Sequence, residues 1–181
     1  MKAIPSIRVI ALSLVGPCVM AGCVNTDTAV VRTSRPAMTA FSRTTEPTES
    51  QVQDLVAAER FVEAGQYQEA IRLFEELLAQ NPTLADAYLG LGSVYRRTDN
   101  LAAAEVNYAR AARLEPDSFD AQAGHGMVLQ SLGRYSEAVV AYQRALLIDP
   151  TSLEANLGAA TSLVEMRRPK AALRFAREAV R

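Results

Sequence analysis

Residues 85–97 read ADAYLGLGSVYRR, an amphipathic helical pattern that contains several small residues and two tyrosines. A second helical pattern follows and closes at Pro116. Pro82 and Pro150 lie 34 residues to either side of Pro116, and each closes a segment of the same shape. Internal similarity at a period of about 20 to 50 residues is typical of arrays whose units stack on their neighbours. The sequence therefore predicts a helical repeat array.

Residue types recur at matching positions of the four segments. Small residues should let the two helices of a pair approach, large residues should fill the space toward the next pair, and alanines should allow close packing on the other side. The small set is Ala58, Gly92, Gly126 and Ala160; the large set is Phe61, Tyr95 and Leu129; the alanine set is Ala70, Ala104, Ala138 and Ala172. Because one helix pair cannot bury its own apolar face, the pairs must stack.

This pattern resembles the tetratricopeptide repeat. The resemblance implies an all-α fold, a right-handed superhelix of about four helix-turn-helix repeats at residues 51–84, 85–118, 119–152 and 153–181.

Several local signals mark the ends of the predicted helices. Gly65 and Gly133 are suited to helix C-caps, where a left-handed backbone costs glycine little. Ser50 and Gln53 have the spacing of a capping box, which predicts a first helix from about residue 51. Pro169 fits the first turn of the last helix. The predicted N-caps are Thr83, Asp117 and Thr151, with a second capping box from Thr151 to Glu154.

Residues 1–22 have the pattern of a bacterial lipoprotein signal peptide. Lys2 and Arg8 precede a short apolar run, which at 12 residues is too short for a bilayer span of about 20 residues. The end of this segment, Met20-Ala-Gly-Cys23, resembles a lipobox, which implies that Cys23 is lipidated. Cleavage at Cys18, ordinary secretion and a signal anchor are the alternatives. The residue after Cys23 is not the aspartate that retains such lipoproteins at the inner membrane, so the outer membrane, facing the periplasm, is expected.

Residues 23–50 are rich in threonine, serine and proline and lack apolar periodicity. Such a segment buries too little apolar surface to offset the entropy of ordering, so we predict a flexible linker. A binding peptide around Val30, Val31, Met38 and Phe41 is the alternative. The net charge of −1 gives no attraction to nucleic acid, and no nucleic-acid partner is expected.

No catalytic, metal-binding or cofactor-binding constellation is recognisable, so an enzyme is not expected. The only histidine, His125, should be packed or hydrogen-bonded in a helix. Gly90 and Gly92, like Gly124 and Gly126, belong to helical patterns rather than to a phosphate-binding loop. The last helix could expose apolar residues, which arginines at 174, 177 and 181 would keep soluble; a homodimer through this helix is the alternative.

The resemblance implies a peptide-binding groove lined by the first helix of each repeat. Aligned on the family, its main candidates are Leu55, Glu59, Val62, Leu89, Ser93, Arg96, Arg97, Met127, Gln130, Leu157, Thr161 and Val164. Further positions on the same faces are Val52, Glu63, Asp86, Asp120, Ala123, Ser131, Glu154 and Glu165. The expected ligand is a peptide or helix with apolar anchors and an acidic group near Arg96 and Arg97.

A short lipoprotein built of such repeats is similar to the TadD-like lipoproteins of Flp (Tad) pilus assembly. That similarity implies a lipid-anchored adaptor with protein partners, such as a secretin or other pilus-assembly components. The type IV pilotins and the NlpI-like adaptors, which recruit peptidoglycan hydrolases or proteases, are the alternatives.

Overall fold

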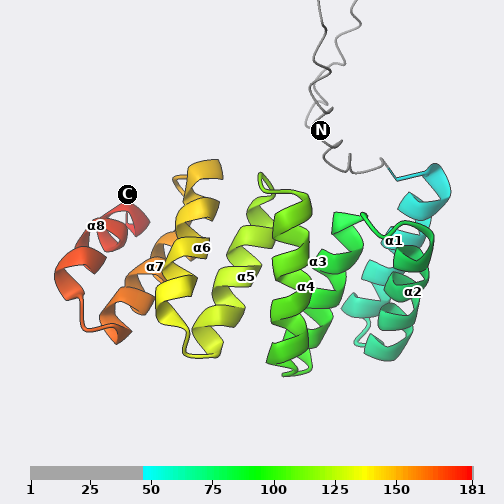
Figure 1. Ribbon diagram of the computed structural model, residues 1–181, viewed down its shortest axis with the longest axis horizontal. Helices are drawn as coiled ribbons and strands as arrows, with labels where there is room; N and C mark the ends of the chain where they lie inside the picture. Colours follow the sequence, from blue (N-terminus) through cyan, green and yellow to red (C-terminus); the bar gives the residue numbers. More distant parts are fainter. Residues whose placement is uncertain (1–46, 181) are drawn as a thin grey trace, which may run out of the picture. The chain divides into compact units, whose positions relative to one another are not determined.

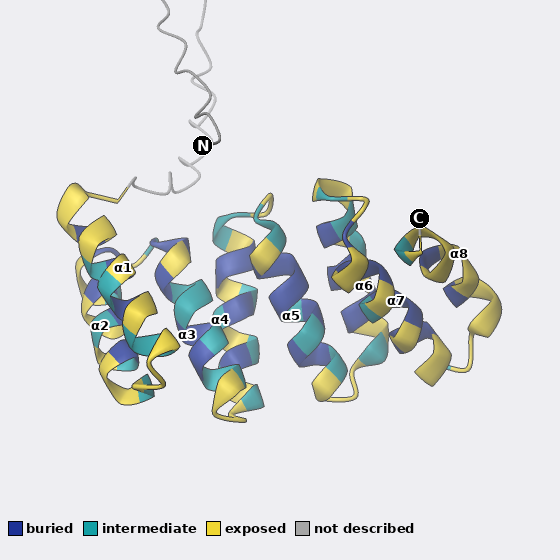
Figure 2. Ribbon diagram, turned by 180° about the vertical axis from the view of Figure 1, so that it is seen from behind, coloured by how far each residue is buried: buried dark blue, intermediate teal, exposed yellow. Residues whose placement is uncertain are grey.

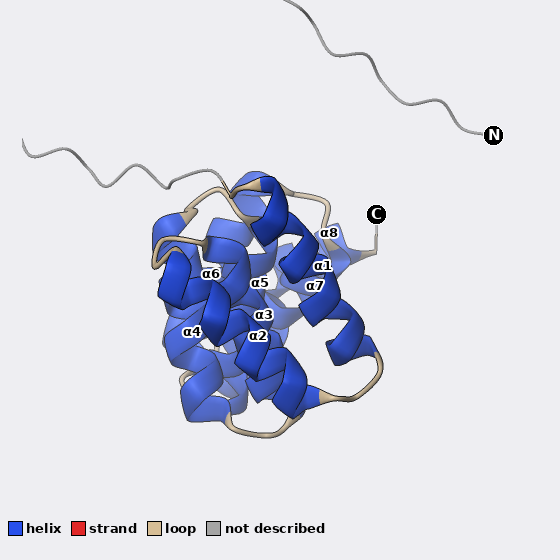
Figure 3. Ribbon diagram, turned by 90° about the vertical axis from the view of Figure 1, so that its right-hand side faces the viewer, coloured by secondary structure: helices blue, strands red, loops and turns tan. Residues whose placement is uncertain are grey.

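The computed structural model describes residues 47–180, and within them every regular element is an α-helix (Figures 1 and 3). The eight helices of this region are α1 (Glu49–Glu63), α2 (Tyr67–Gln80), α3 (Ala85–Arg97), α4 (Leu101–Leu114), α5 (Phe119–Ser131), α6 (Tyr135–Ile148), α7 (Leu153–Glu165) and α8 (Pro169–Ala179). They form four helix pairs in chain order, which confirms the predicted all-α superhelix of tetratricopeptide type. The predicted signal peptide, lipidated Cys23 and most of the linker lie outside the described residues.

The odd-numbered helices form the inner layer of the array. Each helix packs on its neighbours in sequence, and in addition α1 contacts α3, α3 contacts α5 and α5 contacts α7. The even-numbered helices make no such contacts with one another. An array whose first helices touch from pair to pair while its second helices spread apart is curved, with the first helices on the concave side. Buried residues lie between the layers (Figure 2). The loops are largely exposed, but Asn81, Leu84 and Ser152 in the turns between repeats are buried.

An aromatic ring joins each pair to the next. Phe74, Tyr108 and Tyr142 occupy the same position of α2, α4 and α6, and each is at most 4% exposed. A Cβ at Gly124 of α5 would lie 2.3 Å from Cε1 of Tyr108, and one at Gly90 would be equally close to the Phe74 ring. The ring of one repeat therefore lies directly on the backbone of the next repeat's first helix.

The same rings also pack on small residues within their own pair. A Cβ at Gly92 would lie 2.9 Å from the Tyr108 ring, and one at Gly126 would lie 3.0 Å from the ring of Tyr142. This contact confirms the predicted role of the small residues in letting the two helices approach. Ala70, Ala104 and Ala138 are fully buried, as the repeat pattern predicted.

Every first helix ends in the same hydrogen-bonded turn. The amide of Gln66 donates to the carbonyl of Phe61 over 2.8 Å, and the equivalent bonds close α3, α5 and α7. This bond is characteristic of the Schellman motif, which requires a left-handed residue. Gly65 (φ +73°) and Gly133 (φ +74°) supply it, which confirms the predicted caps; Asp99 (φ +60°) and Arg167 (φ +57°) supply it in the other two turns.

Replacing Arg167 with glycine should raise the free energy of unfolding by about 1 kcal/mol, because a side chain in the left-handed region costs about 1–2 kcal/mol. Urea unfolding followed by circular dichroism would measure the change. Arg168→Gly is the matched control, since Arg168 has φ −114° and gains nothing from glycine. If the Arg167→Gly protein has no higher free energy of unfolding than the Arg168→Gly protein, the backbone of Arg167 is not strained at this turn.

Three of the predicted helix starts are wrong by one or two residues. The capping box of α1 is formed by Thr48 and Gln51 rather than by Ser50 and Gln53, so the helix begins at Glu49. Ser118 and Ser152, not Asp117 and Thr151, accept the cap hydrogen bonds of α5 and α7. The Thr151 hydroxyl instead donates to Asp149 Oδ1 over 2.7 Å, in the turn that follows α6.

Two further starts show how variable the caps are. The predicted N-cap Thr83 is also wrong: its hydroxyl donates to Asn81 Oδ1 in the equivalent turn, and α3 begins after Leu84 without a side-chain cap. The predicted placement of Pro169 in the first turn of α8 is confirmed. In residues 47–180, no helix combines the length and the apolar character needed to cross a membrane.

Candidate binding groove

The concave layer holds a depression of about 400 Å³ between α1, α3 and α5. Its base is apolar. Val62 of α1, Leu89 of α3, and Phe119 and Met127 of α5 line it, and each of these side chains is only partly buried. Partly buried apolar side chains that converge on a concave surface are typical of sites that bind apolar groups of a ligand.

The rim of this depression is acidic. Its charged lining residues are Glu59, Glu63, Asp86, Asp120 and Glu154, and no lysine or arginine of residues 47–180 lines it. Asp86, Asp120 and Glu154 recur every 34 residues, in the first turns of α3, α5 and α7. The helix dipole favours negative charge at a helix N-terminus. An acid at this position therefore stabilises its helix and also contributes negative charge to the groove.

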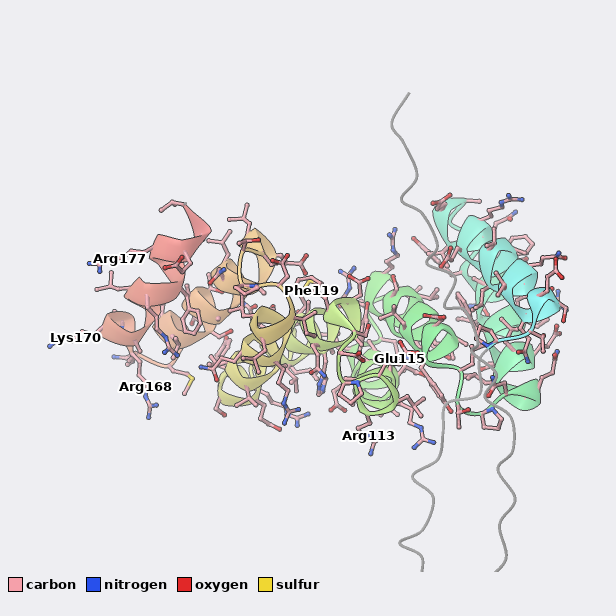
Figure 4. All side chains as sticks on the ribbon, turned by 90° about the horizontal axis from the view of Figure 1, so that it is seen from above. Arg113, Glu115, Phe119, Arg168, Lys170 and Arg177 are labelled. Atoms are coloured by element: carbon pink, nitrogen blue, oxygen red, sulfur yellow. The ribbon has the colours of Figure 1, made fainter. Side chains whose placement is uncertain are left out.

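The electrostatic effect of these acids is visible at Glu115, in the turn before α5. Burial raises the pKa of Glu115 above its ordinary value, and repulsion from Asp86 and Asp117 raises it further. Glu115 and Phe119, at the start of α5, are labelled in Figure 4. The N-terminal ends of α3 and α5 are thus a region of negative potential.

A second depression, of about 530 Å³, lies between the C-terminal halves of α3, α5 and α7 and has a different character. Arg96 is its only cationic lining residue, and Gln130 and Thr161 lie on the same surface. Gln130 Nε2 donates to Thr161 Oγ1 over 2.9 Å, and the Tyr142 hydroxyl donates to Gln130 Oε1 over 2.9 Å. Burial raises the pKa of Tyr142 to about 12, so its hydroxyl remains a donor at physiological pH.

Arg96 is the cation of this surface, and it has no ion-pair partner within residues 47–180. Its Nε is buried and makes no hydrogen bond, and no carboxylate among residues 47–180 is within ion-pair distance of its guanidinium. Asp99 and Glu165 line the same depression but form no ion pair with it. A buried guanidinium donor gains from an acceptor supplied by a ligand.

The structure distributes the sequence-predicted groove residues over three neighbouring depressions. Glu59, Val62, Leu89, Ser93 and Met127 line the first, and Arg96, Gln130, Thr161 and again Met127 line the second. Val164 lines a third depression, with Thr161, between α7 and α8.

Three of the predicted residues line none of these depressions. Leu55 is only 8% exposed and packs into the core shared by α1, α2 and α3, so its assignment to the groove is wrong. Arg97 is exposed on α3, and Leu157 is exposed on α7. Phe119, Leu101 and Tyr135 line the groove but were not predicted. Their positions follow from helix starts and inter-repeat contacts, which the repeat pattern does not specify.

His125 of α5 lies outside the groove and is hydrogen-bonded, in agreement with the sequence prediction. Its Nε2 is 3.5 Å from Glu105 Oε1 of α4. Burial lowers the pKa of His125, and the hydrogen bond to Glu105 opposes that shift only in part. Glu105 also approaches Arg134 at 3.5 Å, so the histidine belongs to a small network between α4 and α5.

Comparison with known proteins assigns the family. The tetratricopeptide repeat profile matches residues 61–127 and 129–181. The chain therefore belongs to the tetratricopeptide repeat family. Among curated proteins, none matches this chain.

Solved structures of MamA share the fold. The MamA AMB-1 structure is 25% identical and has a TM-score of 0.64, over 70% of this chain and 69% of that one. Another MamA structure is 24% identical with a TM-score of 0.68, over 72% and 76%. A MamA RS-1 double mutant, at 15% identity, has a TM-score of 0.67 over 74% and 75%.

A tetratricopeptide array with these relatives is a protein-interaction scaffold, and proteins of this kind are generally non-enzymatic adaptors. In residues 47–180 no three histidine, cysteine, aspartate or glutamate side chains are grouped so that they could hold a metal ion.

Proposed function

We propose that this chain is a lipid-anchored adaptor that holds protein partners of a bacterial envelope machine, with Flp (Tad) pilus biogenesis or secretion as the first candidate. One structural observation supports the adaptor role most strongly. The concave layer joins an apolar base to charged groups that have no ion-pair partner within residues 47–180. Such a surface can bind a polypeptide segment through apolar anchors and fix its position through polar ones.

The anchor part of the proposal comes from the sequence. The pattern Met20-Ala-Gly-Cys23 supports lipidation at Cys23, and the residues that follow support a periplasmic location at the outer membrane. Because α1 begins at Glu49, the proposed flexible linker is residues 24–47, which would span roughly 30 Å and hold the array away from the bilayer. The chain would then present its groove to periplasmic or membrane-embedded partners without a fixed orientation.

Arg96 is the proposed subsite for an acidic group of the partner. Its buried Nε and the absence of an ion pair in residues 47–180 support this role. Gln130 and Thr161, which are bonded to each other on the same surface, offer further hydrogen bonds beside it. A carboxylate placed there would gain a charge-assisted bond of the stronger kind.

The experiment is site-specific photo-crosslinking in intact cells. A photo-reactive residue replaces Met127 in the groove, and a matched one replaces Val140, which is 47% exposed on the outer helix α6. We expect the Met127 position to capture secretin or pilus-assembly components from the membrane fraction, and the Val140 position not to. Arg96→Glu should lower the yield from Met127, and Arg97→Glu, outside the depression, should leave it unchanged.

Two results would contradict this proposal. Capture of peptidoglycan hydrolases or proteases at Met127 would move the chain to cell-wall regulation. Equal capture of the same proteins from Met127 and Val140 would show that the groove is not the contact surface.

A further inference from the structure

The proposed function does not specify the chemistry of the partner, but two of the acids of α1, Glu59 and Glu63, indicate it. Glu63 is the last residue of α1, where the helix dipole disfavours negative charge by about 0.3–1 kcal/mol. Glu59 lies one turn before it, and like charges four residues apart on a helix repel each other. Neither carboxylate has an ion-pair partner in the described part of the chain, and both line the apolar depression. Helix stability therefore does not account for their placement.

The other charged residues of the rim are also negative. Asp86, Asp120 and Glu154 face the same depression from α3, α5 and α7. The cations of the last helix pair lie at the far end of the array, where Figure 4 shows Arg168, Lys170 and Arg177. None of them lines this depression. Its negative charge is consequently left for a ligand to neutralise.

We infer that the depression between α1, α3 and α5 binds a polypeptide segment in which lysine or arginine side chains flank an apolar anchor. This inference rests on the proposed adaptor function and specifies its partner. The anchor would lie on Val62, Leu89 and Met127, and the cations would meet the carboxylates of the rim. Phosphate-bearing ligands and acidic peptides are repelled by the same carboxylates.

The two depressions together give the bound segment a polarity. Carboxylates surround the first depression, and Arg96 is the unpaired cation of the second. Met127 lines both, so one continuous segment can reach from one to the other. The cationic part of the segment lies over α1 and α3, and its acidic group reaches Arg96. The second depression is also lined by Asp99 and Glu165, so it is the Arg96 guanidinium, and not a net positive charge, that would favour one direction of binding over the reverse.

The test measures the affinity of the full-length chain for two labelled peptides by fluorescence anisotropy. One peptide is a short amphipathic sequence of leucine and lysine, and the other has glutamate in place of every lysine. We expect the lysine peptide to bind more tightly, with a preference that weakens as salt is raised. Glu59→Gln with Glu63→Gln should weaken its binding about fivefold, as expected for two partly screened ion pairs.

Matched variants separate this effect from a general loss of charge. Glu69→Gln with Glu75→Gln removes two exposed acids of the outer helix α2 and should leave both affinities unchanged. Because Glu63 stands at an unfavourable helix end and Glu59 repels it, their neutralisation should not lower the midpoint of thermal unfolding. A loss of affinity in this double variant can therefore be attributed to the binding site and not to unfolding of the protein.

The outcomes also distinguish this inference from the proposed function. If Met127→Glu weakens both peptides while the Glu59 and Glu63 double variant changes neither, the groove binds peptides without selecting cations, and only this inference fails. Tighter binding of the glutamate peptide would overturn it as well. If neither groove variant affects binding of either peptide, the groove itself is the wrong site and the proposed function fails with it. A double variant that abolishes self-association but not peptide binding would identify a second copy as the occupant and overturn the inference.

Discussion

Replacing Tyr142 with alanine is expected to lower the free energy of unfolding by about 4 kcal/mol, the magnitude typical of a buried aromatic residue replaced by alanine. Tyr142 is 1% exposed. Its ring packs on Gly126 of its own repeat and on Gly158 of the next repeat, where a Cβ would come within 2.3 Å of it. The hydroxyl donates to Gln130 in the groove. One side chain thus joins the third repeat to the fourth and supports the groove surface.

The loss should also change how the array unfolds. In a repeat protein each unit is stabilised mainly by its neighbours, so a weakened contact uncouples the units on its two sides. Urea unfolding of Tyr142→Ala should therefore show a broader transition as well as a lower midpoint. Tyr142→Phe is the matched control: it keeps the ring and loses one hydrogen bond, at a cost of about 1 kcal/mol. A Tyr142→Ala protein that loses no more than the phenylalanine variant would show that the ring does not join the repeats.

Gly124→Ala is expected to destabilise the protein by about 2 kcal/mol, the middle of the range for overpacking a core. On an exposed helix the same change would stabilise by about 1 kcal/mol, because alanine is the better helix former. Here the new Cβ would lie 2.3 Å from Cε1 and 2.7 Å from Cδ1 of Tyr108. The Tyr108 ring is buried between two helix pairs and cannot move aside without opening the contact.

A double-mutant cycle identifies the cause. In a Tyr108→Leu background the clash is absent, and Gly124→Ala should become neutral or stabilising; contacting residues are expected to be non-additive in this way. Both proteins can be compared by urea unfolding. A Gly124→Ala chain more stable than the parent would contradict the close approach of Tyr108 to α5.

The fold followed from the sequence because its determinants are local and periodic. Pro82, Pro116 and Pro150 end the second helices at a fixed interval, and Gly65 and Gly133 end the first helices in a conformation that glycine adopts easily. The helix starts were less predictable, since several threonine, serine and aspartate side chains compete for the same role in each turn. Asp99 and Arg167 in the left-handed region carry no sequence signal of this kind.

Only some of the glycines that contact the aromatic rings could be assigned a role from the sequence. Gly92 and Gly126 were expected to let the helices of one pair approach. The roles of Gly90, Gly124 and Gly158 were not predicted, although each lies 16 residues after the ring it receives. A glycine within a helical pattern does not reveal whether its neighbour comes from the same repeat or from the previous one. The two cases can be told apart only from the structure, which shows how α3, α5 and α7 pack on the preceding helix pairs.

The groove was predictable in outline but not in its charge. Alignment placed Val62, Leu89 and Met127 on the concave face, where the structure has them. The alignment also assigned Leu55 to the groove, but its side chain is buried in the core. For the charge of the groove, the sequence prediction relied on Arg96 and Arg97 as the contact for an acidic ligand group. All five acids of the rim were among the predicted groove positions, but the sequence did not show that residues from α1, α3, α5 and α7 gather around one depression. Lipidation at Cys23, the linker and the location at the outer membrane remain predictions from the sequence.

Hydrogen–deuterium exchange of the full-length chain, with and without a saturating concentration of the leucine–lysine peptide, tests most directly whether the concave layer binds polypeptides. We expect the peptide to slow amide exchange in segments from α1, α3 and α5, and to leave α2 and α4 unchanged. Slowed exchange confined to the outer helices α2, α4 and α6, in a sample where anisotropy shows the peptide to be bound, would contradict the account.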